Sequence, residues 1–446
     1  MQQISNINPA AAVFTLIMAI LFIVLPRKYA ALPLLMTTLY LPLGQVVMIS
    51  SLHFTMFRVM VLVGFARIAM RREHKDVKLN KIDKFFMLYV VSNLIIYTIQ
   101  WKTSTSFIYI SGHTYNAIGA YFLFRFLIKD YDDCRILMKM MAIIIVPVAF
   151  AVLTEMSTGR NFFSIFGGVR EFSEIRDGRV RCQASFAHPI LAGMFGATTM
   201  PLFLSFWCKD SLGNKNAITG IVGFSAATII AMGATSSGAL MSYGFAIIAL
   251  LIWFYRDHMR AIRWGVFISL LIMHMLMKAP VWFLMARIAD ILGGSGWHRA
   301  QIVDAAVNHF DEWWLLGTRK TVHWTGQGFL DNPDAADITN HFVGVGITGG
   351  VISLIFFVLV IVYCFQRLGV SLQLVKDATT SVKMALWTLG VALFAHIISF
   401  MSVSYYDQIS VFYFMLLAVI ASITTSNSLS TNSINDNLIQ DTKATA

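Results

Sequence analysis

The sequence predicts an all-α polytopic integral membrane protein. Of its 446 residues, 57% are apolar and only 13% are charged, whereas soluble domains average about 25% charged residues. Apolar runs long enough to cross a hydrocarbon layer of about 30 Å recur along the whole chain. These runs do not alternate between apolar and polar residues as the strands of a membrane barrel do. Helices are therefore expected to form every crossing.

About 12–14 membrane-spanning helices are expected, and thirteen fit the sequence best. Their boundaries are accurate to a few residues, and the short divider 233–238 makes the eighth and ninth spans the hardest to separate. The expected spans are 9–25, 30–50, 54–70, 84–101, 107–129, 136–156, 187–207, 216–233, 237–255, 261–278, 342–366, 384–402 and 408–425.

The distribution of Lys and Arg predicts the orientation of these spans, because cytoplasmic loops of membrane proteins are enriched in both residues. If the spans alternate, most of the 34 Lys and Arg residues fall on one side, which we assign to the cytoplasm. The N-terminus then lies outside. No basic region precedes the first apolar run, so we expect a retained anchor and no cleavable signal peptide.

The expected organisation is one transmembrane domain, residues 1–426, followed by a polar tail, 427–446. The tail would lie in the cytoplasm, and its Ser-, Thr- and Asn-rich composition predicts disorder. Two long outside loops, 157–186 and 279–341, interrupt the transmembrane domain. We expect these loops to form the functional site.

The composition also argues against several kinds of site. The net charge of +11 does not indicate nucleic-acid binding, because the basic residues gather at the ends of the spans. The four cysteines are scattered and only Cys182 faces outside, so neither a disulfide nor a cysteine metal site is expected. His309 and His323 lack metal-ligand spacing with any Cys or Glu. We therefore expect no metal and no cofactor.

Basic residues on the outside are concentrated in the two long loops. A cationic chamber would hold an anionic ligand, and the planar fork of arginine suits phosphate. The alternative is that long loops are translocated whatever their charge, so that the excess has no function. The ten residues in or beside these loops, eight of them arginines, are Arg160, Arg170, Arg176, Arg179, Arg181, Lys278, Arg287, Arg299, Arg319 and Lys320.

In the first loop, three arginines precede a helix expected to start near Pro189, since proline suits a first helical turn. Arg179 and Arg181 would lie at the membrane surface near a helix N-terminus, which favours an anion. Arg181 is the first candidate and Arg176 a further one; the alternative is anchoring by snorkelling side chains. His188 would stand at the entrance of the span as either a catalytic or a hydrogen-bonded structural histidine.

In the second loop, amphipathic spacing from Trp297 onward predicts a helix that follows a glycine-rich break. Arg299 would lie on its first turn and contact the same anionic ligand. Arg287, Trp297 and His298 are further candidates for binding this ligand. The glycine-rich break matches no Walker or dinucleotide pattern.

His341 stands at the junction between the second loop and the next apolar helix. Histidine titrates near neutral pH and is a natural general base. Asp337 or Asn340 would orient its ring. The alternative is an interfacial histidine that is hydrogen-bonded to a carbonyl.

Several short motifs lie between about 180 and 370. They are Arg181-x(4)-Phe186-x-His188-Pro189, the turn 232–239, Arg299-x(4)-Asp304-Ala305-Ala306, Leu316-Gly317-Thr318, and Asn340-His341-Phe342 with Gly349-Gly350. Together they resemble the motifs of the O-antigen ligase and O-antigen polymerase family. Two departures are the serine at 237, where the family has arginine, and the Asn-His order at 340–341, where His-Asn is commoner.

The resemblance implies a metal-independent inverting glycosyltransferase with a GT-C-like membrane fold. Such an enzyme acts at the periplasmic face of the bacterial inner membrane on glycans carried by undecaprenyl diphosphate. Arg181 and Arg299 would bind the diphosphate, and His341 would deprotonate or position the acceptor hydroxyl. The remaining candidates would contact diphosphate or glycan: Arg176, Arg179, His188, Arg287, Trp297, His298, Asp337 and Asn340.

The resemblance leaves the acceptor open. We favour a polymerase that joins undecaprenyl-diphosphate-linked oligosaccharide repeat units of an O-antigen or exopolysaccharide. The first alternative is an O-antigen ligase that transfers the glycan to lipid A core. A second is a carrier or flippase for an anionic lipid-linked substrate, although no internal repeat is evident. The expected partners are the lipid-linked oligosaccharide and membrane lipids, with a chain-length regulator and a flippase, and no nucleic acid.

Overall fold

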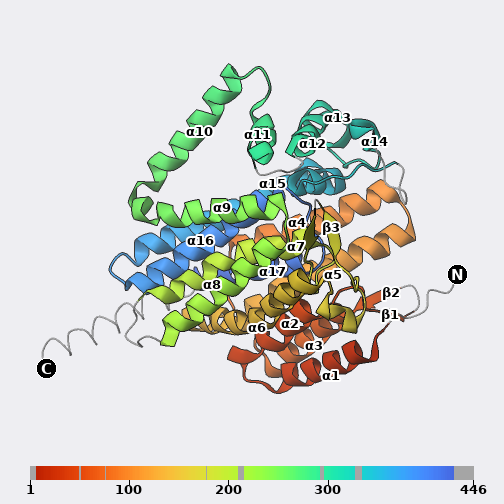
Figure 1. Ribbon diagram of the computed structural model, residues 1–446, viewed down its shortest axis with the longest axis vertical. Coiled ribbons are helices and arrows are strands. Elements are labelled where there is room, and N and C mark those ends of the chain that lie inside the picture. Colours follow the sequence, from red (N-terminus) through yellow and green to blue (C-terminus); the bar gives the residue numbers. More distant parts are fainter. Residues whose placement is uncertain are drawn as a thin grey trace, which may run out of the picture.

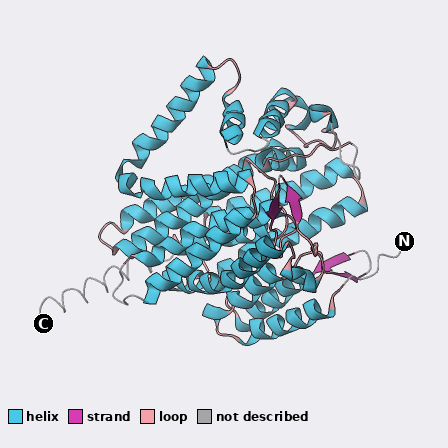
Figure 2. Ribbon diagram, in the orientation of Figure 1, coloured by secondary structure: helices cyan, strands magenta, loops and turns pink. Residues whose placement is uncertain are grey.

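The computed structural model describes residues 7–49, 52–75, 77–176, 178–208, 215–291, 296–326 and 334–425, and these are largely helical (Figures 1 and 2). The elements are α1 (Pro9–Val24), η1 (Arg27–Tyr29), α2 (Ala31–Tyr40), β1 (Val46–Ile49), β2 (Leu52–Thr55), α3 (Met56–Arg71), α4 (Lys81–Trp101), α5 (Ser104–Leu127), α6 (Tyr131–Thr158), η2 (Phe162–Phe166), β3 (Glu174–Arg176), β4 (Arg179–Arg181), α7 (Pro189–Thr199), η3 (Met200–Trp207), α8 (Lys215–Gly233), α9 (Ser237–Leu251), η4 (Ile252–His258), α10 (Met259–Leu276), η5 (Val281–Phe283), α11 (Leu284–Ile291), α12 (Gly296–Asn308), α13 (Phe310–Trp313), α14 (Val322–Thr325), α15 (His341–Leu374), α16 (Thr380–Phe400) and α17 (Gln408–Ile423).

Seven helical stretches among the described residues are long and apolar enough to cross a membrane, and α1 and α17 are shorter apolar helices. The strands of this part of the chain form two hairpins, β1–β2 and β3–β4. The predicted helical character is confirmed for the described residues, and the seven candidate spans are compatible with a membrane protein. The number of crossings and the GT-C-like fold stay predictions, and the tail 427–446 lies outside the described residues.

The predicted spans coincide with helices, but their extents need correction. The predicted span 30–50 is wrong beyond residue 40, because α2 ends there and Val46–Ile49 pairs with Leu52–Thr55 in a hairpin. Pro42 explains the end, since proline cannot continue the helical hydrogen-bond pattern. The predicted spans 237–255 and 261–278 form one 40-residue helical stretch, which is bent at Tyr255.

The helix α17 lies at the centre of the bundle. Its residues are apolar around the whole circumference and nearly all of them are buried, as expected of a helix enclosed on every side. It packs on α5, while α4 packs along α15 and α6 along α8. The helix α10 is the opposite case, because it stands apart from the bundle (Figure 1) and has no buried residue.

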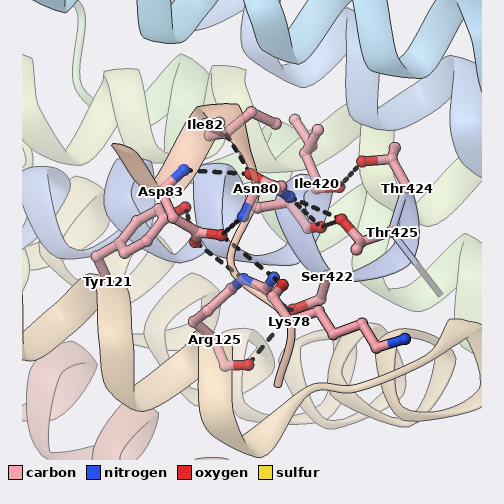
Figure 3. A network of polar contacts seen from close by, with 11 residues as sticks. Lys78, Asn80, Ile82, Asp83, Tyr121, Arg125, Ile420, Ser422, Thr424 and Thr425 are labelled. Atoms are coloured by element: carbon pink, nitrogen blue, oxygen red, sulfur yellow. Dashed lines mark hydrogen bonds and ion pairs between the residues drawn. The ribbon is translucent and has the colours of Figure 1, made fainter. Parts of the chain in front are cut away.

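A buried polar network joins α4, α5 and α17 (Figure 3). The carboxylate of Asp83 accepts hydrogen bonds from Arg125 Nε at 3.0 Å and from the Tyr121 hydroxyl at 2.8 Å. The side chain of Asn80 caps α4 and donates to the carbonyl of Ala421 at 3.0 Å. Each member is satisfied, as buried polar groups must be to avoid a large cost in stability.

The described residues of the two predicted outside loops are structured. The first contains η2 and the β3–β4 hairpin, and the second contains η5 and α11–α14. The predicted helix after Trp297 is confirmed as α12, and its residues Ile302 and Ala306 are buried as the amphipathic pattern requires. In Figure 1, β3 and α12–α14 lie toward the same side of the bundle.

Candidate functional site

The β3–β4 hairpin separates the three arginines of the first loop. Glu174 pairs with Arg181 and Arg176 with Arg179 in an antiparallel register. Arg176 and Arg179 are exposed, whereas Arg181 is only 7% exposed. Successive side chains of a strand point to opposite faces, so the pattern Arg-x-Arg places Arg179 and Arg181 on the same face of β4. Neighbouring residues cover Arg181 but leave Arg179 exposed.

The turn between α8 and α9 holds the strand of Arg181 in place. The backbone N–H of Cys182 donates to the carbonyl of Gly233 at 3.1 Å. The hydroxyl of Thr235 donates to the carbonyl of Val180 at 3.3 Å. Two of the motifs behind the family resemblance, the arginine strand and the turn 232–239, are therefore in direct contact.

Glu155 completes this support and was missed by the sequence analysis. It is fully buried near the end of α6, and its carboxylate accepts backbone N–H groups of Gln183 and Ala184 at 3.0 Å each, and the Ser173 hydroxyl at 2.6 Å. A lone acidic residue in an apolar span marks a constrained position. That signal was available in the sequence, because no other acidic residue lies between 134 and 170.

Two buried arginines have guanidinium groups with unused donors. Arg181 donates once, to Glu174 at 3.2 Å, and its buried Nε has no hydrogen-bond partner. Arg299 is also 7% exposed, and none of the residues that the structure describes accepts a hydrogen bond from it. Burial lowers the pKa of Arg299 from its usual value. A guanidinium has five N–H donors, so both side chains retain the capacity to bind an anion.

His188 forms the N-cap of α7 and begins the helix as predicted. Its Nδ1 accepts the N–H of Ile190 at 3.2 Å, so the neutral ring has its proton on Nε2. The charged groups of Arg181, Glu174 and Asp337 lie within electrostatic range of the ring. His188 is thus both a structural cap and the meeting point of the two loops.

The segment 334–340 connects the second loop to the end of the bundle. The carbonyl of Asp337 lies 3.3 Å from His298 Nε2, which ties the segment to the first turn of α12 beside Arg299. The Ser404 hydroxyl donates to the carbonyl of Ile338 at 2.7 Å. This geometry extends the site from the arginine hairpin to the turn between α16 and α17.

Asp407 in that turn is a second group missing from the predicted site. Its Oδ2 accepts the N–H of Ala187 at 2.8 Å, next to His188. Its backbone has φ 62° and ψ −153°, a conformation that costs a residue other than glycine about 1–3 kcal/mol and clusters at functional sites. Burial raises its pKa to about 6, against the opposing effect of backbone N–H groups.

His341 lies where it was predicted, at the first residue of α15, but the predicted orienting groups are wrong. Its Nδ1 accepts the backbone N–H of Tyr405 at 3.2 Å, while buried Asn340 uses its side chain to cap α15 through Val343. No described hydrogen bond joins Asp337 to the ring. The proton of the neutral ring is therefore on Nε2. The Nε2–H group donates hydrogen bonds, and the lone pair on Nδ1 is already used, so the ring has no free lone pair with which to act as a base.

The two glycine motifs of the second loop region pack against each other. Gly350 has φ 64° inside α15, and a Cβ there would lie 2.4 Å from the Leu315 carbonyl oxygen. The same close approach allows the N–H of Val351 to donate to the Trp314 carbonyl at 2.8 Å. Gly317 has φ 69°, and its Cβ would lie 2.1 Å from the carbonyl oxygen of Ile347. Only glycine permits both features.

The remaining predicted residues are peripheral in this geometry. Arg176, Arg179 and Arg287 are exposed. Trp297 is 59% exposed and packs against Phe283, with ring centres 5.3 Å apart. They are therefore not part of the buried centre of the site.

His309 and His323 were predicted to lack metal-ligand spacing with any Cys or Glu, but the fold places both beside Glu312. One ring nitrogen of His309, one ring nitrogen of His323 and a carboxylate oxygen of Glu312 all lie within 4.8 Å of one another. His309 lies three positions before Glu312 and His323 eleven positions after it, and the meeting of all three depends on the contact between α13 and α14.

No protein-family model matches the chain, and no curated protein shows significant similarity to it. The resemblance to the O-antigen ligase and polymerase family rests on the short motifs and stays a prediction.

Proposed function

We propose that the protein is a polysaccharide polymerase, a glycosyltransferase that joins undecaprenyl-diphosphate-linked repeat units. The observation that supports this best is the pair of buried arginines with unused donors, Arg181 and Arg299. Arg181 has a single ion pair, to Glu174, and Arg299 has no acceptor among the described residues. Burying a cation with so few partners is costly, so such a residue in each loop favours a bound anion. A lipid diphosphate supplies that charge and an isoprenoid tail for the bundle.

In the proposed reaction, an acceptor hydroxyl attacks the anomeric carbon of the lipid-linked glycan. The new glycosidic C–O bond forms as the C–O bond to the diphosphate breaks, and the electron pair leaves with the diphosphate. Arginines that contact this group stabilise the negative charge that develops on it, without need of a metal. Attack from the face opposite the diphosphate inverts the anomeric configuration.

The acceptor proton requires a base on the opposite side of the sugar from the diphosphate. His341 was the first candidate, but its Nδ1 accepts the Tyr405 N–H. We assign the base to Asp407, whose pKa of about 6 leaves it ionised near neutral pH and basic enough to accept a proton. His341 then positions the acceptor through its Nε2–H.

The finer features of the proposal concern the membrane crossings, the fold and the location in the cell. They are thirteen crossings, a GT-C-like fold and an inner-membrane location with the site toward the periplasm. The apolar helices support only the coarser statement that the protein is a helical membrane protein. A flippase would supply the lipid-linked units, and a chain-length regulator would act on the polymer.

In the test, the wild-type protein or a variant is expressed in cells that lack the native gene. Their lipid-linked and surface glycans are then separated by size. Wild type should make a ladder of long lipid-linked chains, whereas Arg181→Ala and Arg299→Ala should leave single repeat units at equal membrane expression. Arg160→Ala is the matched control, because Arg160 is exposed in the same loop and pairs with exposed Glu171.

Two other outcomes would reject the polymerase. Long lipid-linked chains that persist in the variants, with transfer to lipid A core lost, would identify a ligase. Lipid-linked units that fail to reach the outer face would identify a carrier.

A further inference from the structure

A cluster of two histidines and one glutamate lies in the second loop, outside the proposed donor site. His309 precedes α13, Glu312 lies within α13, and His323 lies in α14. We refer to these three residues as the His–Glu–His cluster. Their ligand atoms all lie within 4.8 Å of one another.

The atoms that face each other are the ones that bind metals. His309 Nδ1 lies 2.9 Å from Glu312 Oε1, and His323 Nε2 lies 3.0 Å from each oxygen of the same carboxylate. Imidazole nitrogen and carboxylate oxygen bind zinc at about 2.0–2.2 Å, so neighbouring ligand atoms of a tetrahedral site are about 3.3 Å apart. The two histidine-to-carboxylate distances are close to this value, so small side-chain adjustments would bring the three ligand atoms around one ion.

The surroundings hold the three side chains in this arrangement. The indole N–H of Trp324 donates to Glu312 Oε2 at 3.2 Å, and its ring stacks on His309 with an angle of 8° between the planes. A hydrogen bond to a ligand carboxylate is a common outer-shell feature of metal sites. Trp324 also belongs to a small buried core with Trp313 and Ile302, which fixes α13 and α14 on α12.

We propose that the His–Glu–His cluster binds one divalent transition-metal ion, with Zn²⁺ as the preferred ion. Two neutral imidazoles and one carboxylate are a ligand set typical of zinc, and they leave a fourth position for water. The bound ion would cross-link α13 to α14 and order this part of the loop. The inference is independent of the proposed glycosyl transfer, since it concerns a different set of residues and predicts binding to the metal alone.

The test uses the purified full-length protein, stripped with a chelator and titrated with Zn²⁺ by calorimetry. Wild type should bind one zinc per chain with micromolar or tighter affinity. His323→Ala and Glu312→Gln should each weaken binding by more than about 100-fold, because even outer-shell partners contribute about 10- to 100-fold. His258→Ala is the matched control, since His258 is an exposed histidine of η4 outside the cluster.

Co²⁺ gives a second readout that does not depend on affinity. Co²⁺-loaded wild type should show the intense visible absorption of a four-coordinate site, and His323→Ala should lose it while its helical content, measured by circular dichroism, is unchanged. Two results would overturn the proposal: failure of correctly folded wild type to bind stoichiometric zinc, or equal binding by Glu312→Gln, His323→Ala and His258→Ala. Either result would identify the cluster as a hydrogen-bonded network around Glu312.

Discussion

The N–H of Cys182 donates to the carbonyl of Gly233 across 3.1 Å, and this bond joins the arginine strand to the turn between α8 and α9. The two residues are about fifty positions apart in the chain. Glu155 holds the next two residues, Gln183 and Ala184, through their N–H groups. The backbone that follows Arg181 is thus held by hydrogen bonds from both α6 and α8. These bonds fix the position of the buried arginine.

Glu155→Gln should destabilise the protein and reduce glycan polymerisation together. The carboxylate accepts three hydrogen bonds, and bonds to a charged group contribute about 1.5–3 kcal/mol each. The amide retains the shape but has only one acceptor oxygen, so we expect a loss of about 2–4 kcal/mol in the free energy of unfolding. Thermal unfolding in detergent and the length of lipid-linked glycans measure the two effects.

Glu171→Gln is the matched control for that change. Glu171 pairs with Arg160 at the surface, and exposed pairs contribute about 0–1 kcal/mol. Equal stability of Glu155→Gln and Glu171→Gln would show that Glu155 does not support the strand.

The sequence predicted where helices begin better than which residues meet. Proline at 189 and the amphipathic pattern after Trp297 correctly indicated where α7 and α12 begin, because capping and periodicity are local properties. The partners of His341 and the contact between Cys182 and Gly233 depend on which helices meet, and no local pattern encodes that. Asp407 was absent from the predicted site for the same reason, since its burial and its contact with Ala187 arise only in the folded chain.

Asp83→Ala should strongly destabilise the bundle without directly altering the proposed site. Arg125 is 3% exposed and donates twice to Asp83, so the change leaves a buried guanidinium without its carboxylate. Removing one partner of a buried pair costs about 3–5 kcal/mol. Chemical or thermal unfolding should show this loss.

The double variant Asp83→Ala, Arg125→Met provides the control for that interpretation. Replacing both charges with apolar groups removes the uncompensated cation, so much of the lost stability should return. A double variant as unstable as the sum of its single changes would contradict the interpretation that the pair acts as a unit.

Arg299→Met should separate stability from function. Arg299 is buried and lacks an acceptor among the described residues, so an apolar side chain of similar length removes an uncompensated charge. We expect a gain of about 1–4 kcal/mol in the free energy of unfolding, as found when buried charges are replaced by packed apolar groups. Polymerisation should be lost, because the diphosphate would lose one of its two buried cations.

Arg319→Met is the comparison for Arg299→Met. Arg319 lies in the same loop, but it is exposed and its guanidinium packs over the ring of Trp101 at 5.2 Å. The Arg319→Met variant should lose up to about 1 kcal/mol in the free energy of unfolding and retain polymerisation activity. Loss of stability in Arg299→Met would indicate that the arginine has a structural role.

Asp407→Asn should change the pH dependence of both activity and stability. Burial raises the folded-state pKa of Asp407 to about 6, above the value of about 3.9 expected in the unfolded chain. Between these values the folded protein binds more protons than the unfolded chain, so this group's contribution to stability is full below about pH 4 and is lost as the pH rises through about 6. The asparagine variant, which does not titrate, should lack this decline.

If Asp407 is also the base, wild-type transfer should rise with pH through about 6, while the variant retains low activity at every pH. Unfolding and initial rates measured from pH 4 to pH 8 test both effects. A stability profile that is unchanged in Asp407→Asn would contradict the raised pKa, and full activity in the variant would return the base role to another residue.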